Sequence, residues 1–217
     1  MHVYALLHSS MTTLTLPAGV AAPLHRIVHE QIAAVVEPDL RLDELQQDDA
    51  ILLQAVLAHD RVIRELFLQT TVLPLRFTSF PTLPDLMADL QTNQQAYLAT
   101  LTRLTGQVEL TLKFEPVTIE EQPIGADLKG KDYFLAKKQQ YQTQQQQREL
   151  QDEELTRIVQ AIAHLYPISV QPDSRHVHVL VSQNKLAVLH EQLTKLKQTS
   201  TLWRCSIGEP LPPFHFV

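Results

Sequence analysis

Cysteine and long apolar runs are nearly missing from the sequence. Cys205 is the single cysteine among 217 residues, and one thiol forms neither an internal disulfide nor a cysteine-ligated zinc site. No run approaches the roughly 18 apolar residues of a transmembrane helix, and the N-terminus has no basic region typical of a signal peptide. We therefore expect a soluble protein of a reducing cytoplasm.

Basic clusters, glycine and aromatic residues are scarce as well. The formal net charge is −6 and no lysine- or arginine-rich block occurs, so neither nucleic acid nor an anionic membrane is an expected partner. Aromatic residues make up 6% and glycines number 5, whereas hydrophobic residues reach 44%. The cores must be built mainly from Leu, Val, Ile and Ala, which favours helices packed on sheets, and the length suits two small domains.

Motifs of catalytic and cofactor chemistry are also absent. The sequence contains no glycine-rich phosphate loop, nucleophile elbow, His-Glu-x-x-His pattern or paired-cysteine metal motif. We therefore predict no enzyme activity, no catalytic residue, and no cofactor or bound metal. An enzyme of another type stays an alternative.

Three of the ten histidines stand in patterns that can carry chemistry. His176 and His178 share one face of a predicted strand, a spacing that can support a metal ion, but no third ligand is evident. We interpret both as ordinary residues on a partly wet face. His59 lies in an apolar helical stripe, and we interpret it as a hydrogen-bonded core or boundary histidine rather than a catalytic base.

Apolar periodicity predicts an α+β domain over residues 1–115. Strands are expected at 3–7, 71–77 and 108–114, and helices at 48–69 and 82–104. Residues 32–36 are interpreted as a strand, with the end of a short helix as the alternative. The apolar stripe of the first helix is formed by Leu52, Val56, His59, Ile63 and Leu66. Thr82 and Asp85 form a capping pattern for the second helix, and the alternation over 108–115 indicates a sheet with one wet face.

A linker and a second α+β domain follow. Residues 116–131 carry the prolines and glycines of a connection, and residues 132–217 form the second domain. Its predicted elements are a helix over 133–165 with a solvated, glutamine-rich middle, strands at 168–170 and 176–181, a helix near 186–196 and a strand at 202–207. The predicted fold class is α+β, with two small helix-on-antiparallel-sheet domains, ferredoxin-like in character, joined by a linker and a long helix.

The strand that follows the first helix is a candidate for partner contact. Alternation places Leu73, Leu75 and Phe77 on one side and Arg76 on the other. Pro74 predicts an edge position or a bulge, because proline cannot donate to a ladder. Arg76 either pairs with a carboxylate or with carbonyl groups, or contacts a partner directly.

The proline-rich tail over residues 208–217 is the second candidate. Its three prolines are incompatible with a regular helix or strand, so packing must hold it in place. Phe214 and Phe216 either fill a groove on the body and lock the two domains together, or form an exposed apolar strip for a partner.

These two segments carry a family resemblance. Residues 70–77, Thr-Thr-Val-Leu-Pro-Leu-Arg-Phe, are similar to the helix-to-strand signature of the GvpF/GvpL gas vesicle proteins, which ends in Leu-Pro-Leu-Arg-Phe. Residues 208–217 resemble the family's Gly-Pro-Trp-Pro-Pro-Tyr-x-Phe ending. The sequence has Thr78 and Ser79 where the family usually has Gly-Thr, and Leu211 where Trp is common, which suits a divergent member.

The resemblance implies a minor, non-enzymatic gas vesicle component. It implies a part in gas vesicle assembly and nucleation, a shell-associated location within the cytoplasm, and contact with other gas vesicle proteins. The principal partner would be the shell protein GvpA, whose aggregation the protein would limit. The partner-binding residues expected on this basis are Leu73, Leu75, Arg76, Phe77, Phe214 and Phe216. The alternative is a two-domain regulatory or small-ligand-binding module without catalysis.

Overall fold

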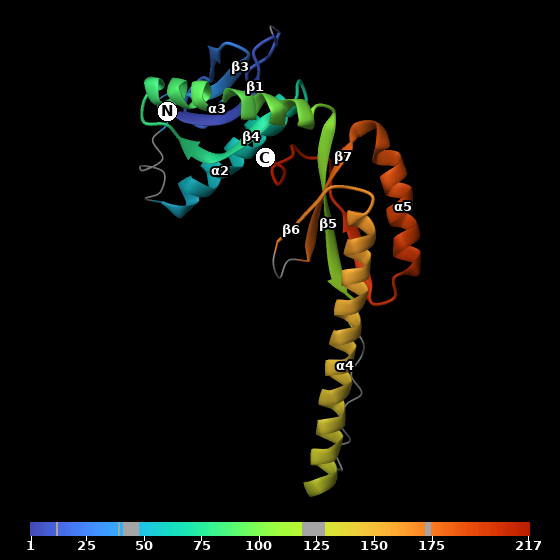
Figure 1. The fold of residues 1–217 in the computed structure, drawn as a ribbon. Coiled ribbons are helices and arrows are strands. Elements are labelled where there is room, and N and C mark those ends of the chain that lie inside the picture. The colour runs from blue at the N-terminus through green and yellow to red at the C-terminus, as the bar shows by residue number, and fades with distance from the viewer. Residues whose placement is uncertain (12, 39, 41–47, 119–128, 172–174) are drawn as a thin grey trace. The chain divides into compact units, whose positions relative to one another are not determined.

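The computed structural model describes residues 1–217 except 12, 39, 41–47, 119–128 and 172–174 (Figure 1). The chain divides into two compact units. Unit 1 contains Met1–Glu109 and Pro210–Val217, and unit 2 contains Leu110–Glu209. Of the helices within the described residues, none combines the length and the apolarity needed to cross a membrane. Most of the predicted linker lies outside the described residues.

Unit 1 is built on a four-stranded antiparallel sheet with the strand order β2-β3-β1-β4. Its elements are β1 (His2–His8), β2 (His25–His29), β3 (Ile32–Glu37), α2 (Asp49–Phe67), β4 (Leu73–Ser79) and α3 (Leu83–Leu104). The predicted strand at 32–36 is confirmed as β3. Strand β2 was not predicted from the sequence, because this edge strand buries little of its surface and carries few apolar residues.

The sheet of unit 1 is covered on both faces, by α2 on one and α3 on the other (Figure 1). Along β3, Ala33 and Val35 belong to the cluster on the α2 side, whereas Ile32, Ala34 and Val36 belong to the cluster on the α3 side. Every residue of β3 is therefore buried. This explains why the segment reads as a continuous apolar run rather than as an alternation.

Helices α2 and α3 of unit 1 begin with side-chain caps. The Asp48 carboxylate accepts the backbone N–H groups of Ala50 and Ile51, at 2.8 and 3.3 Å. Thr82 and Asp85 form the predicted capping box of α3. These caps satisfy N–H groups that have no partner within a helix, so the helix starts follow from local sequence.

Unit 2 contains a second four-stranded sheet, with the order β6-β7-β5-β8. Its elements are β5 (Gln107–Pro116), α4 (Gly130–Ala163), β6 (Ile168–Val170), β7 (His176–Ser182), a single 3-10 turn (Gln183–Lys185), α5 (Leu186–Thr199) and β8 (Trp203–Ile207). Leu112 and Phe114 of β5 are buried while Lys113 and Glu115 are exposed, so the predicted wet face is confirmed for this half of the strand, but Glu109 on the same face is buried.

The two units differ from the predicted domain limits at two places. Residues 108–115 were predicted to belong to the first domain, but β5 pairs with β8 from Leu112 to Pro116 and belongs to unit 2 from Leu110 onward. The tail at Pro210–Val217 belongs to unit 1. Strand pairing between segments about ninety residues apart has no local signature in the sequence.

Candidate partner-binding surface

Strand β4 forms one edge of the sheet in unit 1, as Pro74 predicted. Its pairing with β1 changes register: Val3 lies opposite Thr78, whereas Ala5 lies opposite Pro74. An advance of two residues along β1 therefore corresponds to four residues along β4. The extra residues form a bulge around residues 75–77 of β4. A bulge of this kind redirects side chains and interrupts the edge of a sheet.

The bulge separates residues that were predicted to share a face. Leu73 is buried in the cluster on the α3 side, and Leu75 packs against the same cluster. Phe77 instead contacts the rings of His2 and His59, with ring centroids 4.7 and 5.3 Å apart. The expectation that Phe77 lies beside Leu73 and Leu75 was wrong, because strict alternation holds only in a regular strand. Arg76 is exposed.

His59 of α2 connects this part of β4 to the core. Its Nε2 lies 3.0 Å from the carbonyl oxygen of Leu75, which can only accept, so Nε2 carries the proton. Nδ1 is therefore the acceptor in the 2.8 Å bond from His2 Nε2. Burial lowers the pKa of His59, and its bond to Leu75 only partly opposes that effect. The prediction of a hydrogen-bonded core histidine is confirmed.

Tyr4 extends this buried cluster towards the loop before β2. A register shift between Val3 and Ala5 also affects the pairing of β1 with β3, and it brings both Tyr4 and Ala5 to the α2 side. The Tyr4 ring stacks on His59 with centroids 5.0 Å apart. Its hydroxyl donates to the Glu37 carboxylate, and burial raises the pKa of Tyr4 far above its ordinary value.

The Glu37 carboxylate holds the loop in place through three consecutive backbone groups. It accepts the N–H groups of Val20 at 2.9 Å, Ala21 at 2.7 Å and Ala22 at 2.5 Å. Burial alone would raise the pKa of Glu37, but these bonds and the Tyr4 hydroxyl outweigh burial and lower it. Gly19 permits this approach, because a Cβ there would lie 2.6 Å from Glu37 Oε2.

The first half of α2 exposes a group of apolar side chains, here called the α2 apolar patch. It consists of Ile51, Leu53, Val56 and Leu57, with exposed fractions of 48%, 59%, 41% and 60%. The predicted stripe assigned Val56 to the buried side. The buried residues of α2 are instead Ala55, His59, Val62, Ile63 and Leu66. The signal missed in the sequence was the excess of apolar residues over 51–57, more than one buried face can hold.

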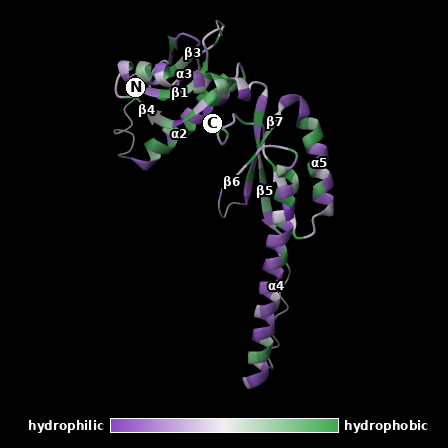
Figure 2. Cartoon of the chain, in the orientation of Figure 1, coloured by the Kyte–Doolittle hydropathy of each residue, from purple (hydrophilic) through white to green (hydrophobic). Residues whose placement is uncertain are grey.

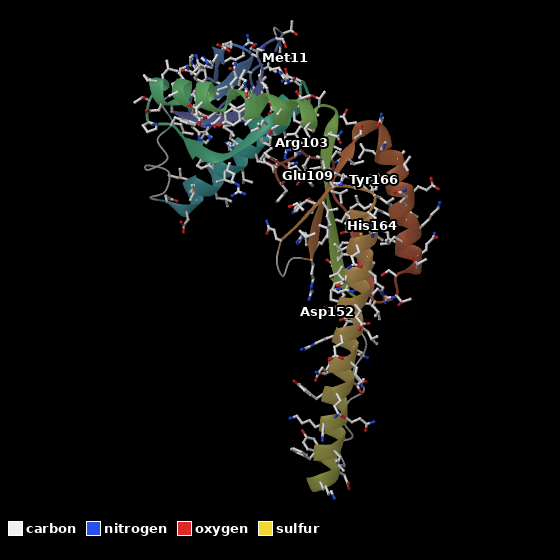
Figure 3. The ribbon with its side chains drawn as sticks, in the orientation of Figure 1. Met11, Arg103, Glu109, Asp152, His164 and Tyr166 are labelled. Atoms are coloured by element: carbon white, nitrogen blue, oxygen red, sulfur yellow. The ribbon has the colours of Figure 1, made fainter. Side chains whose placement is uncertain are left out.

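The tail folds back onto unit 1, and polar groups fix it there. Leu211 and Glu109 exchange two backbone hydrogen bonds of 2.9 and 2.8 Å. The buried Glu109 carboxylate accepts the His215 backbone N–H at 2.9 Å and lies 2.7 Å from His215 Nδ1. Phe214 packs against the cluster on the α2 side. The Phe216 carbonyl accepts from Arg103, which Figure 3 labels together with Glu109.

The remaining predicted residues lie in unit 2. His178 is buried on β7, 3.1 Å from the hydroxyl of Thr111, while His176 is exposed. Both were expected on a partly wet face, and this expectation holds for His176 alone.

Cys205 is half-buried, and burial raises its pKa. A raised thiol pKa means little thiolate at neutral pH, which makes Cys205 a poor nucleophile.

Two solved structures have the same fold. The crystal structure of gas vesicle protein GvpF from Anabaena sp. PCC7120 gives a TM-score of 0.66 at 12% sequence identity, covering 99% of this chain and 94% of that one. GvpF from Microcystis aeruginosa gives 0.64 at 13% identity, covering 99% and 97%. Comparison with curated protein sequences gives no match. The fold is therefore that of these two GvpF proteins.

The sequence itself identifies the family. Residues 1–217 match the family model described as gas vesicle synthesis protein GvpL/GvpF. The chain belongs to this GvpL/GvpF family, and its role is in gas vesicles. The resemblance inferred from residues 70–77 and 208–217 is confirmed.

Proposed function

We propose that the protein assists gas vesicle assembly by binding the shell protein GvpA and limiting its aggregation before the shell forms. The observation that carries this proposal is the α2 apolar patch, a set of exposed side chains on one helix of unit 1. Leu53, Val56 and Leu57 are three or four residues apart or adjacent in the helix and so lie next to one another, and neighbouring exposed apolar side chains are costly in water and mark interaction sites. The protein would act at the vesicle shell, within the cytoplasm.

A physical need for such a protein follows from the chemistry of a hydrophobic, β-rich shell subunit. Uncovered apolar strands pair with one another and aggregate. A helix that offers apolar side chains can cover such a segment reversibly, because burial of each large side chain contributes roughly 1.5–3 kcal/mol.

The bulged edge of β4 packs against α2, the helix that carries the patch, and supports the same proposal. His59 joins α2 to β4 through the carbonyl of Leu75, and the exposed Arg76 follows directly. The part of β4 outside the bulge lies at the sheet edge, where a strand can accept a strand from a partner through main-chain hydrogen bonds. Among the six residues predicted to bind the partner, we assign direct contact to Arg76. We assign Leu73 a supporting position, since it is 5% exposed.

The test is a pull-down of GvpA with the full chain, together with light scattering of GvpA alone and in mixture. We expect Leu53→Ser/Leu57→Ser to lose both binding and suppression of aggregation. The matched control is Leu165→Ser/Val188→Ser, which removes side chains that are 62% and 50% exposed in unit 2. Equal behaviour of the two double variants, or an unmodified chain that neither binds GvpA nor reduces scattering, would refute the proposal.

A further inference from the structure

Helix α4 of unit 2 combines an anchored half with an exposed half. Its buried side chains are Ile158 and Ile162, near its C-terminal end. Glu154 accepts from Ser200 at 2.7 Å, and the Trp203 indole donates to the Gln151 carbonyl at 2.8 Å. Towards its N-terminus the helix extends beyond the sheet of its own unit (Figure 1). This extending part is mostly hydrophilic (Figure 2).

The extending part nevertheless exposes large aromatic side chains. Phe134 is 69% exposed and Tyr141 is 67% exposed. Both belong to a fully exposed stripe that advances alternately by three and four residues: Lys131, Phe134, Lys138, Tyr141, Gln145, Arg148 and Asp152. This spacing keeps the side chains on one face of a helix and is the repeat of a helix–helix seam.

Charge is distributed unequally along α4. Residues 129–141 contain four lysines and one aspartate, whereas residues 142–154 contain four carboxylates and one arginine. Basic residues near the N-terminus of an isolated helix oppose its macrodipole. Lys129, at the N-cap, makes no side-chain capping bond to the described part of the helix. An antiparallel neighbour with the same sequence would place each basic half beside an acidic half.

A groove at the base of the extending part provides a receiving surface. It has a volume of about 610 Å³, and its lining includes Arg148, Asp152, Arg175 and Trp203. Figure 3 labels Asp152 at this level of α4. Arg148 lies seven residues after Tyr141, and Phe134 lies seven before it. Two antiparallel helices that cross at Tyr141 would therefore bring Phe134 of each copy to the groove of the other.

We infer that α4 is a self-association element through which two copies of the chain pair antiparallel. The contact is two-fold symmetric, so each interaction occurs twice. Tyr141 meets Tyr141 of the second copy at the centre, Phe134 lies against the Arg148 guanidinium, and Lys131 faces Asp152. The pairing is independent of GvpA, since α4 lies in unit 2 and the α2 apolar patch in unit 1.

Sedimentation equilibrium of the full chain tests the pairing. We expect a monomer–dimer equilibrium that Lys131→Glu weakens by about tenfold or more, because two ion pairs become repulsive. The same change puts an acidic residue in the first turn, which favours the helix, so loss of the dimer cannot reflect a weakened helix. The matched control is Lys137→Glu, an equal charge change on the same helix but off the stripe.

Reversing the charge of Asp152, the proposed partner of Lys131, should restore the dimer that Lys131→Glu weakens. Asp152→Lys alone should also weaken the dimer, and Lys131→Glu/Asp152→Lys should restore it. A chain that stays monomeric at every concentration reached overturns the inference. So does a dimer that Lys131→Glu and Lys137→Glu weaken equally.

Disulfide trapping tests the orientation in a Cys205→Ser background. A mixture of Phe134→Cys and Arg148→Cys chains should form a cross-linked heterodimer, whereas Phe134→Cys alone should not cross-link. Efficient cross-linking of Phe134→Cys with itself would show a parallel pair and would overturn the antiparallel arrangement.

Discussion

At the scale of single residues, buried polar groups decide how the N-terminal strand sits in unit 1. Hydrophobic periodicity correctly placed His59 in the core, but its bond to His2 joins residues 57 positions apart. The same limit applies to Glu37, which ends an apolar strand and gave no sign of the loop it holds. A hydrogen bond between distant residues depends on the final topology, and local sequence patterns do not encode it.

Glu37→Gln should destabilise unit 1. The amide supplies one acceptor oxygen in place of a carboxylate that accepts from Tyr4 and three N–H groups. We expect a loss of about 2–3 kcal/mol in the free energy of unfolding at neutral pH, measured by urea denaturation. The exposed Glu30→Gln serves as control and should change stability by less than about 0.5 kcal/mol.

The same variant should alter the response to acid. The fold lowers the pKa of Glu37 below its ordinary value of 4.5, so the carboxylate contributes its full stabilisation above that value. The contribution is lost as the pH falls through the lower pKa of the folded state. The stability difference between the unchanged chain and Glu37→Gln should therefore shrink on acidification, and a difference that stays constant with pH would contradict this account.

At the scale of elements, the helix starts were the most predictable features. Thr82 and Asp85 lie three residues apart and cap each other's backbone groups, so the signal and its cause lie within one turn. The α2 stripe was less well predicted. Ala55 is small enough to allow close approach to the sheet, whereas Val56 turns outward, and periodicity alone gave Val56 the buried position.

Thr82→Ala should cost about 1 kcal/mol of stability, because the backbone N–H of Asp85 loses its acceptor. Thermal or urea unfolding of the full chain measures it. Thr92→Ala is the control within the same helix: its hydroxyl bonds only back to the Ala88 carbonyl, which already belongs to the helix ladder. Equal losses in the two variants would show that the cap contributes nothing specific.

At the scale of the whole molecule, both units draw on segments that are far apart in the chain. The α+β class and both antiparallel sheets could be predicted, because periods of 2 and 3.6 residues survive in the sequence. The sequence could not predict which unit contains β5 or which unit contains the tail. Strand β5 crosses the boundary between the two units, and its sequence pattern shows only one continuous strand. The proline-rich tail has no periodicity that would indicate where it packs.

Removal of Pro210–Val217 should lower the thermal unfolding midpoint of unit 1 by at least about 5 °C. The deletion uncovers the surface under Phe214 and removes the His215 partner of the buried Glu109. Circular dichroism of the full and shortened chains measures the shift. Deletion of Val217 alone, a residue 53% exposed, should leave the midpoint nearly unchanged, and a similar midpoint for both deletions would show that the tail is only an appendage.

The return of the tail to unit 1 also has a consequence for synthesis. A ribosome makes Met1–Glu109, then all of unit 2, and then Pro210–Val217. Unit 1 is thus begun before unit 2 and completed after it, against the usual order in which the earlier domain folds first during translation. A chain released early could carry a finished unit 2 but never a finished unit 1. Full assembly of the α2-side core therefore requires that translation has passed residues 210–217.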